Sequence, residues 1–191
     1  QPGELVLDVC SAPGGKTTHM AALMENRGRI VACDIYDHKL QRVMENAARL
    51  GINIIDTMLK DAREIHQDFP QQADRVLVDA PCSGLGVLRR KPDSRWRKTQ
   101  QLLKELPELQ LEILKSGAAC VKPGGILVYS TCTIAREENQ AVVEKFLKDN
   151  AEFQLEHTGS RLPVPREDAM VQLYPQRDGT DGFFIACMRR K

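Results

Sequence analysis

Short apolar runs alternate with segments of helical spacing along most of the chain, and this alternation is the strongest constraint on its fold. The runs that predict strands are residues 5–9, 29–34, 54–59, 75–79, 126–130, 153–156 and 183–187. Between most of them, apolar side chains recur every three or four residues, as on one face of a helix. Strands that alternate with helices form a mostly parallel sheet with helices on both faces. The sequence therefore predicts a seven-stranded α/β domain over residues 1–191.

Two proline-containing segments lead to more specific expectations. Pro107 suits the first turn of a helix, where its missing N–H needs no partner. Residues 159–180 are rich in proline and lack a clear period, so we expect a long surface loop there.

Composition narrows the class of protein. With 42% hydrophobic residues the chain can bury a core, yet no apolar run approaches the roughly 20 residues of a membrane span. The six cysteines form no Cys-x-x-Cys pair and have no histidines at zinc-like spacing, so we expect no metal and a reduced, cytoplasmic setting. A net charge of +1 neither supports nor excludes an RNA partner. The first residues contain no initiator methionine, no basic leader and no apolar run, so no secretory signal is visible. Because the chain begins almost directly with a strand, we expect a piece of a longer protein, and we expect it to act as a monomer.

The loop after the first strand lies where open α/β sheets bind ligands. It consists of Cys10, Ser11, Ala12, Pro13, Gly14, Gly15 and Lys16. Asp34 ends the second strand at a spacing suited to a ribose hydroxyl pair, and Asp61 follows the third, where it could bind the far end of an adenosine. The alternative is that the glycines only form a turn and the acids only cap helices.

The same loop excludes two common nucleotide motifs. It does not match Gly-x-Gly-x-x-Gly, which argues against nicotinamide and flavin dinucleotides, and it lacks the ending of a P-loop. The remaining ligand is an adenosine whose other end carries a carboxylate. S-adenosylmethionine fits that description.

Two cysteines follow the fourth and fifth predicted strands, Cys82 in Asp-Ala-Pro-Cys at 79–82 and Cys132 in Ser-Thr-Cys-Thr at 130–133. If these strands are neighbours, about 4.8 Å apart, the cysteines lie side by side at the edge of the sheet. A thiolate beside a methyl donor suits methylation of a pyrimidine at carbon 5, because its addition to carbon 6 makes carbon 5 nucleophilic. Asp79 is placed to hydrogen-bond the edge of the base.

These motifs resemble the Nop/Sun family of RNA cytosine-5 methyltransferases. The shared segments are Asp-Val-Cys-Ser-Ala-Pro-Gly-Gly-Lys-Thr at 8–17, Asp-Ala-Pro-Cys-Ser-Gly at 79–84 and Ser-Thr-Cys-Thr at 130–133. Residues 86–93 and 179–184 are similar to the bacterial Sun branch, which methylates a cytosine in small-subunit (16S) ribosomal RNA. The resemblance implies a Rossmann-like fold of the S-adenosylmethionine-dependent methyltransferases and, in longer members, N-terminal sequence that binds RNA.

The resemblance also implies roles for individual residues. Cys132 would be the nucleophile and Cys82 would assist release of the methylated product, while residues 10–16, Asp34, Asp61 and Asp79 would line the cofactor pocket. DNA cytosine-5 enzymes use the Pro-Cys cysteine instead, so Cys82 remains the rival nucleophile. The other four cysteines are interpreted as core packing.

A basic segment is the candidate for RNA contact. It contains Arg89, Arg90, Lys91, Arg95, Arg97 and Lys98, with Trp96 among them. Cationic side chains dominate affinity for nucleic acids, although a solvated charged loop is the alternative interpretation. Three rival functions stay open: a small-molecule methyltransferase, a non-catalytic RNA-binding or ribosome-assembly module and, least favoured by the loop, a nicotinamide-dependent dehydrogenase.

Overall fold

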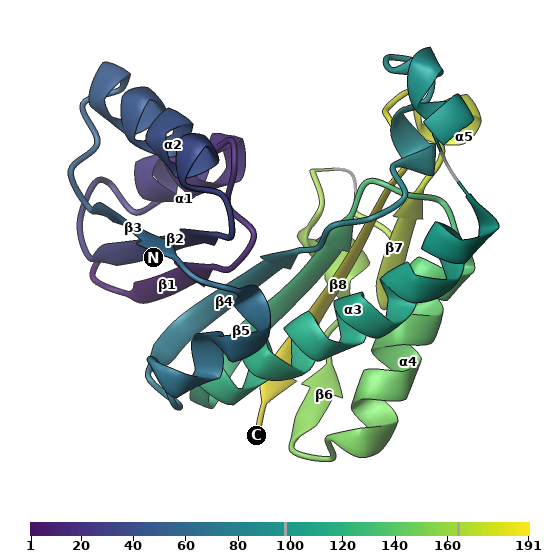
Figure 1. The fold of residues 1–191 in the computed structure, drawn as a ribbon. Helices are drawn as coiled ribbons and strands as arrows, with labels where there is room; N and C mark the ends of the chain where they lie inside the picture. The colour runs from purple at the N-terminus through teal and green to yellow at the C-terminus, as the bar shows by residue number, and fades with distance from the viewer. Residues whose placement is uncertain (98, 164) are drawn as a thin grey trace.

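One twisted sheet runs through the molecule in the order β3-β2-β1-β4-β5-β8-β6, with β7 paired to β8 (Figure 1). The computed structural model describes residues 1–97, 99–163 and 165–191. Its strands are β1 (Leu5–Asp8), β2 (Arg29–Asp34), β3 (Ile55–Leu59), β4 (Ala73–Asp79), β5 (Val121–Thr131), β6 (Phe153–Leu155), β7 (Met170–Leu173) and β8 (Phe183–Arg190). Strands β1 to β5 are parallel to one another, and β8 is antiparallel to its three neighbours β5, β6 and β7.

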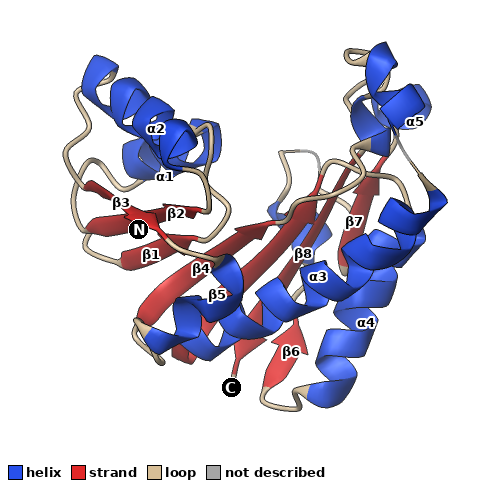
Figure 2. Cartoon of the chain, viewed as in Figure 1, coloured by secondary structure: helices blue, strands red, loops and turns tan. Residues whose placement is uncertain are grey.

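Helices cover both faces of the sheet (Figure 2). The α-helices are α1 (Gly15–Leu23), α2 (Asp37–Arg49), α3 (Gln100–Cys120), α4 (Gln140–Asp149) and α5 (Pro175–Asp178). Short 3₁₀ helices are η1 (Ala62–Gln67), η2 (Leu85–Val87), η3 (Pro92–Arg97), η4 (Arg136–Glu138) and η5 (Thr158–Arg161). In the described part of the chain, no helix combines the length and apolar character that crossing a membrane requires.

Alternation along the strands divides the core into two layers. Val6 and Ile30 point to one face, where they pack with Val43 and Ala47 of α2. The next residues along β1 and β2 point to the opposite face and join side chains of η1, α3 and α4 in the larger cluster. Successive side chains of a strand face opposite sides of a sheet, so near-continuous apolar runs are what a sheet buried on both faces needs. The fold class predicted from the sequence is confirmed.

The number of strands differs from the prediction. The sheet has eight strands rather than seven, because β7 forms inside the segment expected to be a loop. Val171 of β7 pairs with Ile185 of β8 and is fully buried. A strand of four residues has too short a pattern to be recognised in a proline-rich segment, and its hydrogen bonds all come from a partner strand that follows later in the chain.

The helix that contains Pro107 begins earlier than predicted. Pro107 lies inside α3 rather than in its first turn. Proline removes one intrahelical hydrogen bond, but Leu111, Leu114 and Ala118 bury the apolar face of α3 against the sheet. Leu106, on the N-terminal side of Pro107, is buried as well, so the helix has buried side chains on both sides of the proline.

The strand order determines where a ligand can bind. The chain passes from β3 on one side of β1 to β4 on the other, so the order of the parallel strands reverses between β1 and β4. The carboxyl ends of β1, β2, β4 and β5 meet at one edge of the sheet, and ligands of open α/β sheets bind outside such a switch point.

Candidate active site

The loop between β1 and α1 forms one wall of the site. Gly14 precedes α1 with φ of +97°, and a Cβ there would lie 3.1 Å from the Cα of Val43 in α2, so this position requires glycine. Ser11 is buried and donates its hydroxyl hydrogen bond to the Cys33 carbonyl at 3.0 Å. Beneath the loop, Asp8 accepts a hydrogen bond from Thr17 at 2.7 Å, and burial raises the pKa of this carboxyl to about 7. These contacts fix the loop to the sheet.

Two adjoining cavities open at this edge. One has a volume of about 240 Å³ and is lined by Asp34, Asp61 and Asp79 together with Ile35, Tyr36 and Lys39. The second, about 220 Å³, is lined by Ser11, Pro13, Gly15 and Lys16 of the loop. Cys10, Ala12 and Asp79 line both cavities. Their combined volume falls within the range of roughly 300–1,000 Å³ that is typical of small-molecule binding sites.

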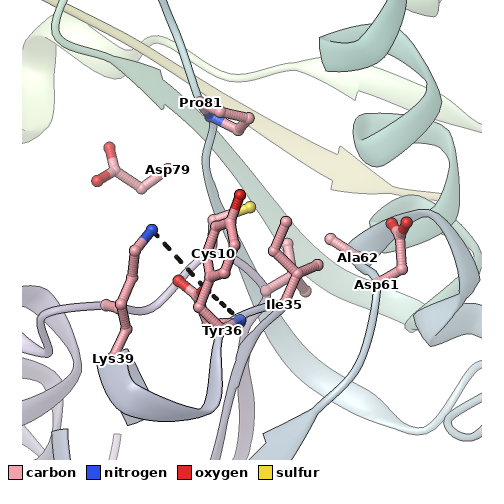
Figure 3. Close-up of a pocket in the computed structure, with 11 residues that line it drawn as sticks. Cys10, Ile35, Tyr36, Lys39, Asp61, Ala62, Asp79 and Pro81 are labelled. Atoms are coloured by element: carbon pink, nitrogen blue, oxygen red, sulfur yellow. Dashed lines mark hydrogen bonds and ion pairs between the residues drawn. The ribbon is translucent and has the colours of Figure 1, made fainter. Parts of the chain in front are cut away.

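The carboxylates of the first cavity are spread around it. Figure 3 shows Asp79 and Asp61 at opposite sides, with the Tyr36 ring between them in this view. Asp34 accepts a hydrogen bond from the Tyr36 backbone N–H at 3.0 Å, and Lys39 lies 4.0 Å from it. Asp61 pairs with Arg63, which lowers the pKa of the Asp61 carboxyl. The predicted strand-end acids therefore share one pocket, with Asp61 already engaged by an arginine.

The two predicted cysteines are in contact. Strands β4 and β5 pair in register with Asp79 opposite Ser130, and the Sγ atoms of Cys82 and Cys132 lie 3.3 Å apart. The predicted adjacency is thus confirmed. Both side chains are partly exposed, whereas Cys33, Cys120 and Cys187 are buried.

The contact makes the two thiols unequal. A hydrogen bond from the Cys82 thiol stabilises the thiolate of Cys132 and lowers the pKa of Cys132 to about 7. The same contact, together with burial, raises the pKa of Cys82. Burial also raises the pKa of Cys10, and it raises those of Cys33 and Cys120 to about 12. Since the thiolate is the nucleophile, this difference in pKa favours Cys132.

Asp79 links the cysteine pair to the loop. Its Oδ1 accepts a hydrogen bond from the Ser130 hydroxyl at 2.7 Å, and its Oδ2 lies 2.7 Å from Nζ of Lys16. The Lys16 ammonium also lies 5.1 Å from the ring centroid of Phe183. Sequence reasoning assigned Lys16 to the cofactor loop alone, because nothing in its local pattern indicates a contact with a strand end 63 residues away.

A second close approach joins the cysteine edge to the C-terminal loop. The Gly86 N–H donates to the Cys132 carbonyl at 3.0 Å, and the Gly182 N–H donates to the Gly86 carbonyl at 2.8 Å. A Cβ on Gly86 would lie 2.0 Å from the carbonyl oxygen of Gly182. Two segments noted in the sequence, 86–93 and 179–184, are therefore in direct contact behind Cys132.

The basic segment is described only in part. Arg89 pairs with Asp181 at 2.9 Å, and Arg90 pairs with the same carboxylate, yet the two arginine side chains are 49% and 65% exposed. Lys91 lies at the surface. Lys98 and the side chains of Arg95 and Arg97 lie outside the described residues.

Sequence reasoning also missed Glu138, a buried carboxylate that contacts the residue after each cysteine. A glutamate just before a helical pattern is typical of a solvated first turn. Nothing local indicated its burial.

The fold and the site together define the class of protein: a Rossmann-like α/β domain of the S-adenosylmethionine-dependent methyltransferase type with a pair of cysteines at the ends of neighbouring strands. More specifically, the chain belongs to the 16S rRNA methyltransferase RsmB/F family, whose model matches residues 1–189.

Individual relatives agree with this assignment. A Bacillus subtilis (strain 168) protein named probable ribosomal RNA small subunit methyltransferase B is 46% identical over 98% of this chain and 43% of that protein. The crystal structure of PH0851 superposes with a TM-score of 0.94 and 40% identity, over 100% of this chain and 43% of that one. NSun6 from Pyrococcus horikoshii, solved with SFG, gives a TM-score of 0.87 and 34% identity, over 98% of this chain and 48% of that one. The chain thus spans less than half the length of these relatives.

Proposed function

We propose that this chain carries the methyl-transfer site of a protein that methylates carbon 5 of a cytosine in RNA, with small-subunit ribosomal RNA as the substrate. The observation that carries the proposal is the 3.3 Å contact between Cys82 and Cys132 beside the pocket lined by Asp34, Asp61 and Asp79. Membership of the RsmB/F family and the name of the Bacillus subtilis relative support the RNA substrate.

The cofactor proposed for the pocket is S-adenosylmethionine, which supplies an electrophilic methyl group when bound. The donor set fits this ligand. Asp34 ends β2 at the position suited to ribose hydroxyls, and Ile35 and Ala62 offer apolar surface for an adenine ring. NSun6, solved with SFG, supports the assignment. The loop residues 10–16, with Asp61 and Asp79, are the remaining proposed contacts.

Cys132 is the proposed nucleophile. Its thiolate adds to carbon 6 of the cytosine, and the electron pair released onto the ring makes carbon 5 nucleophilic toward the methyl group. After methylation, loss of the carbon 5 proton expels the Cys132 thiolate and restores the aromatic ring. Cys82, at 3.3 Å, assists this release.

Asp79 is proposed to bind the edge of the base. Its carboxylate faces Lys16 and Ser130, which hold it at the end of β4 beside both cysteines. From there it can stabilise charge that develops at ring nitrogen 3 when carbon 6 is attacked, with one partner of that contact protonated. Positioned groups of this kind stabilise charge in a transition state because they need no reorganisation.

The direct test uses the full-length protein with methyl-labelled S-adenosylmethionine and unmodified ribosomal RNA, followed by digestion to nucleosides. We expect the label in 5-methylcytidine. Label in a small molecule, in another nucleoside or in no product would contradict the proposal.

The RNA-binding surface is proposed to include the basic segment, Arg89, Arg90 and Lys91 with Arg95, Arg97 and Lys98. The exposed guanidinium groups of Arg89 and Arg90 lie on the chain that follows Cys82, and their contact with Asp181 holds them near the site. Because the thiolate attacks from the ring face, the target cytosine must be unstacked, so a single-stranded or flipped-out nucleotide is the proposed substrate.

We expect Arg89→Gln combined with Arg90→Gln to lower RNA affinity by about tenfold at physiological salt and to reduce the salt dependence by the equivalent of one to two phosphate contacts. The affinity for S-adenosylmethionine should stay unchanged. RNA affinity is measured by filter binding at several salt concentrations.

Asp181→Asn is the matched control, because it removes the other half of the same ion pairs and leaves both cations free. If the arginines contact phosphate, RNA affinity should hold or rise in this variant. A loss in the control equal to that of the double variant would mean that the arginines only anchor the 179–184 loop.

The remaining parts of the proposal concern the setting of the reaction. Both cysteines, the loop and the acids come from a single chain, which supports action as a monomer. Residues 1–191 act as one catalytic domain of a longer protein whose N-terminal region contributes to RNA binding, and a ribosomal RNA substrate implies action in the cytoplasm.

A further inference from the structure

Glu138 is a buried carboxylate at the end of η4. Its residue exposure is 1%. Its Oε2 accepts hydrogen bonds from the backbone N–H of Ser83 at 2.8 Å and from Nε2 of Gln110 at 2.9 Å. Its Oε1 accepts from the Ser83 hydroxyl and faces the Thr133 hydroxyl at 3.3 Å. Both oxygens therefore act as acceptors.

Apart from Gln110 of α3, these donors belong to the two loops that carry Cys82 and Cys132. Ser83 directly follows Cys82, Thr133 directly follows Cys132, and their hydroxyl oxygens are 2.8 Å apart. The Gln110 amide that reaches Glu138 also donates to the Pro81 carbonyl at 2.9 Å, on the other side of Cys82. Glu138 thus bridges the loops one residue beyond each sulfur.

The backbone around Glu138 is fixed as well. The buried Tyr129 hydroxyl donates to the Glu138 carbonyl at 2.6 Å. The next residue, Asn139, accepts from the Thr131 hydroxyl at 2.5 Å and donates to the Thr133 carbonyl at 3.0 Å, so it binds both neighbours of Cys132. The pair Glu138–Asn139 therefore cannot shift without moving the cysteine loops.

If only the stability of the fold mattered, a carboxyl group would be an unfavourable side chain to bury at this position. Removing a carboxylate from water costs several kcal/mol, and well-packed apolar residues often replace buried charges without loss of stability. What an apolar residue cannot do is accept hydrogen bonds from two loops at once. An amide could still bind both loops, because its oxygen can accept from the Ser83 N–H and Gln110 while its NH₂ group donates to the two hydroxyl oxygens, so an apolar side chain is the replacement that removes the bridge.

We propose that Glu138 is a positioning residue: by accepting hydrogen bonds from the residue behind each sulfur, it fixes the contact between Cys82 and Cys132. The catalytic meaning of this inference rests on the proposed function, but the geometric claim does not. Without the bridge, the two loops separate and the Cys132 thiolate loses its hydrogen bond from Cys82.

The test is Glu138→Met in the full-length protein, because methionine has a similar length and cannot hydrogen-bond both loops, with Glu137→Met as the matched control. Glu137 is the exposed neighbour, so the control removes the same charge without touching either loop. The rate of Cys132 alkylation by iodoacetamide is followed against pH by mass spectrometry, without RNA or cofactor. Melting temperature and affinity for S-adenosylmethionine are measured in parallel.

In the unmutated protein and in Glu137→Met, we expect alkylation to rise through a midpoint near pH 7, because the Cys82 thiol lowers the pKa of Cys132 to about 7. In Glu138→Met the midpoint should move toward the value of a free thiol, about 8.5, which slows alkylation at pH 7 on the order of tenfold. The affinity for S-adenosylmethionine should change by less than about twofold, since Glu138 does not line the pocket.

A melting temperature that falls while the alkylation profile stays unchanged would overturn the inference, because Glu138 would then be a structural residue only. If Glu138→Met fails to fold, Thr133→Val removes the hydroxyl through which Glu138 contacts the Cys132 loop, and an unmoved profile in that variant would be equally decisive. The pH profile of alkylation is measured without methyl transfer. It can therefore be interpreted even if the proposed function is wrong.

Discussion

Cys82→Ala in the full-length protein is expected to accumulate a protein–RNA adduct that survives a denaturing gel, whereas Cys132→Ala should form none. Each variant is incubated with S-adenosylmethionine and unmodified ribosomal RNA. The reason is the proposed order of bond formation, in which Cys132 makes the covalent bond to carbon 6, and Cys82, at 3.3 Å, acts after methylation to release the product. Methyl transfer in Cys132→Ala should fall on the order of a thousandfold or more, as for other covalent nucleophiles.

The control for this experiment is Cys120→Ala. Cys120 is buried at the end of α3, and burial raises its pKa to about 12, so its loss should leave both adduct and turnover as in the unmutated protein. An adduct only in Cys132→Ala would reverse the roles of the two cysteines. Retained methyl transfer in both variants would contradict covalent catalysis.

Gly86→Ala is expected to have the largest effect on stability. The added Cβ would lie 2.0 Å from the Gly182 carbonyl oxygen and 2.8 Å from the Cys132 carbonyl oxygen, and backbone atoms cannot swing away as a side chain can. We expect the free energy of unfolding to fall by about 2–3 kcal/mol or more, as for an overpacked site. For a chain of this size that corresponds to a melting temperature lower by roughly 5–10 °C.

Thermal unfolding in the absence of ligand measures this effect, and Gly15→Ala is its control. A Cβ on Gly15 has no atom within 4 Å, and the residue begins α1, so its melting temperature should stay within about 2 °C of the unmutated protein. Equal melting temperatures for Gly86→Ala and Gly15→Ala would show that the 179–184 loop yields freely, and would contradict the close packing behind Cys132.

Much of the fold and of the pocket could be predicted, because the sequence patterns that indicate these parts are local. Patterns of a few neighbouring residues predict the strand at 5–9, the turn at the glycines of the following loop and the acid at position 34. In the structure, β1, the loop and Asp34 lie where the sequence predicts them. The contact between the two sulfur atoms could be predicted on the assumption that β4 and β5 are neighbours. Their parallel pairing places Asp79 opposite Ser130.

Where the prediction failed, the missing information was non-local. Strand β7 forms because β8 supplies its hydrogen-bond partners, and α3 begins before Pro107, where the side chain of Leu106 is buried in the folded domain. In each case a partner distant in the sequence supplies the stabilisation, so a local pattern of proline and polar residues gave the wrong element or the wrong boundary.

By itself, then, the sequence determined the α/β class of this protein, the glycine-containing loop after β1 and the two cysteines that follow β4 and β5, because periodicity and turn residues act over a few positions. Only the tertiary structure decided what surrounds those cysteines. Lys16 reaches Asp79, Arg89 pairs with Asp181 and Glu138 bridges Ser83 and Thr133. The first two contacts join residues 63 and 92 positions apart, and their side chains meet only after the sheet has brought the strand ends together.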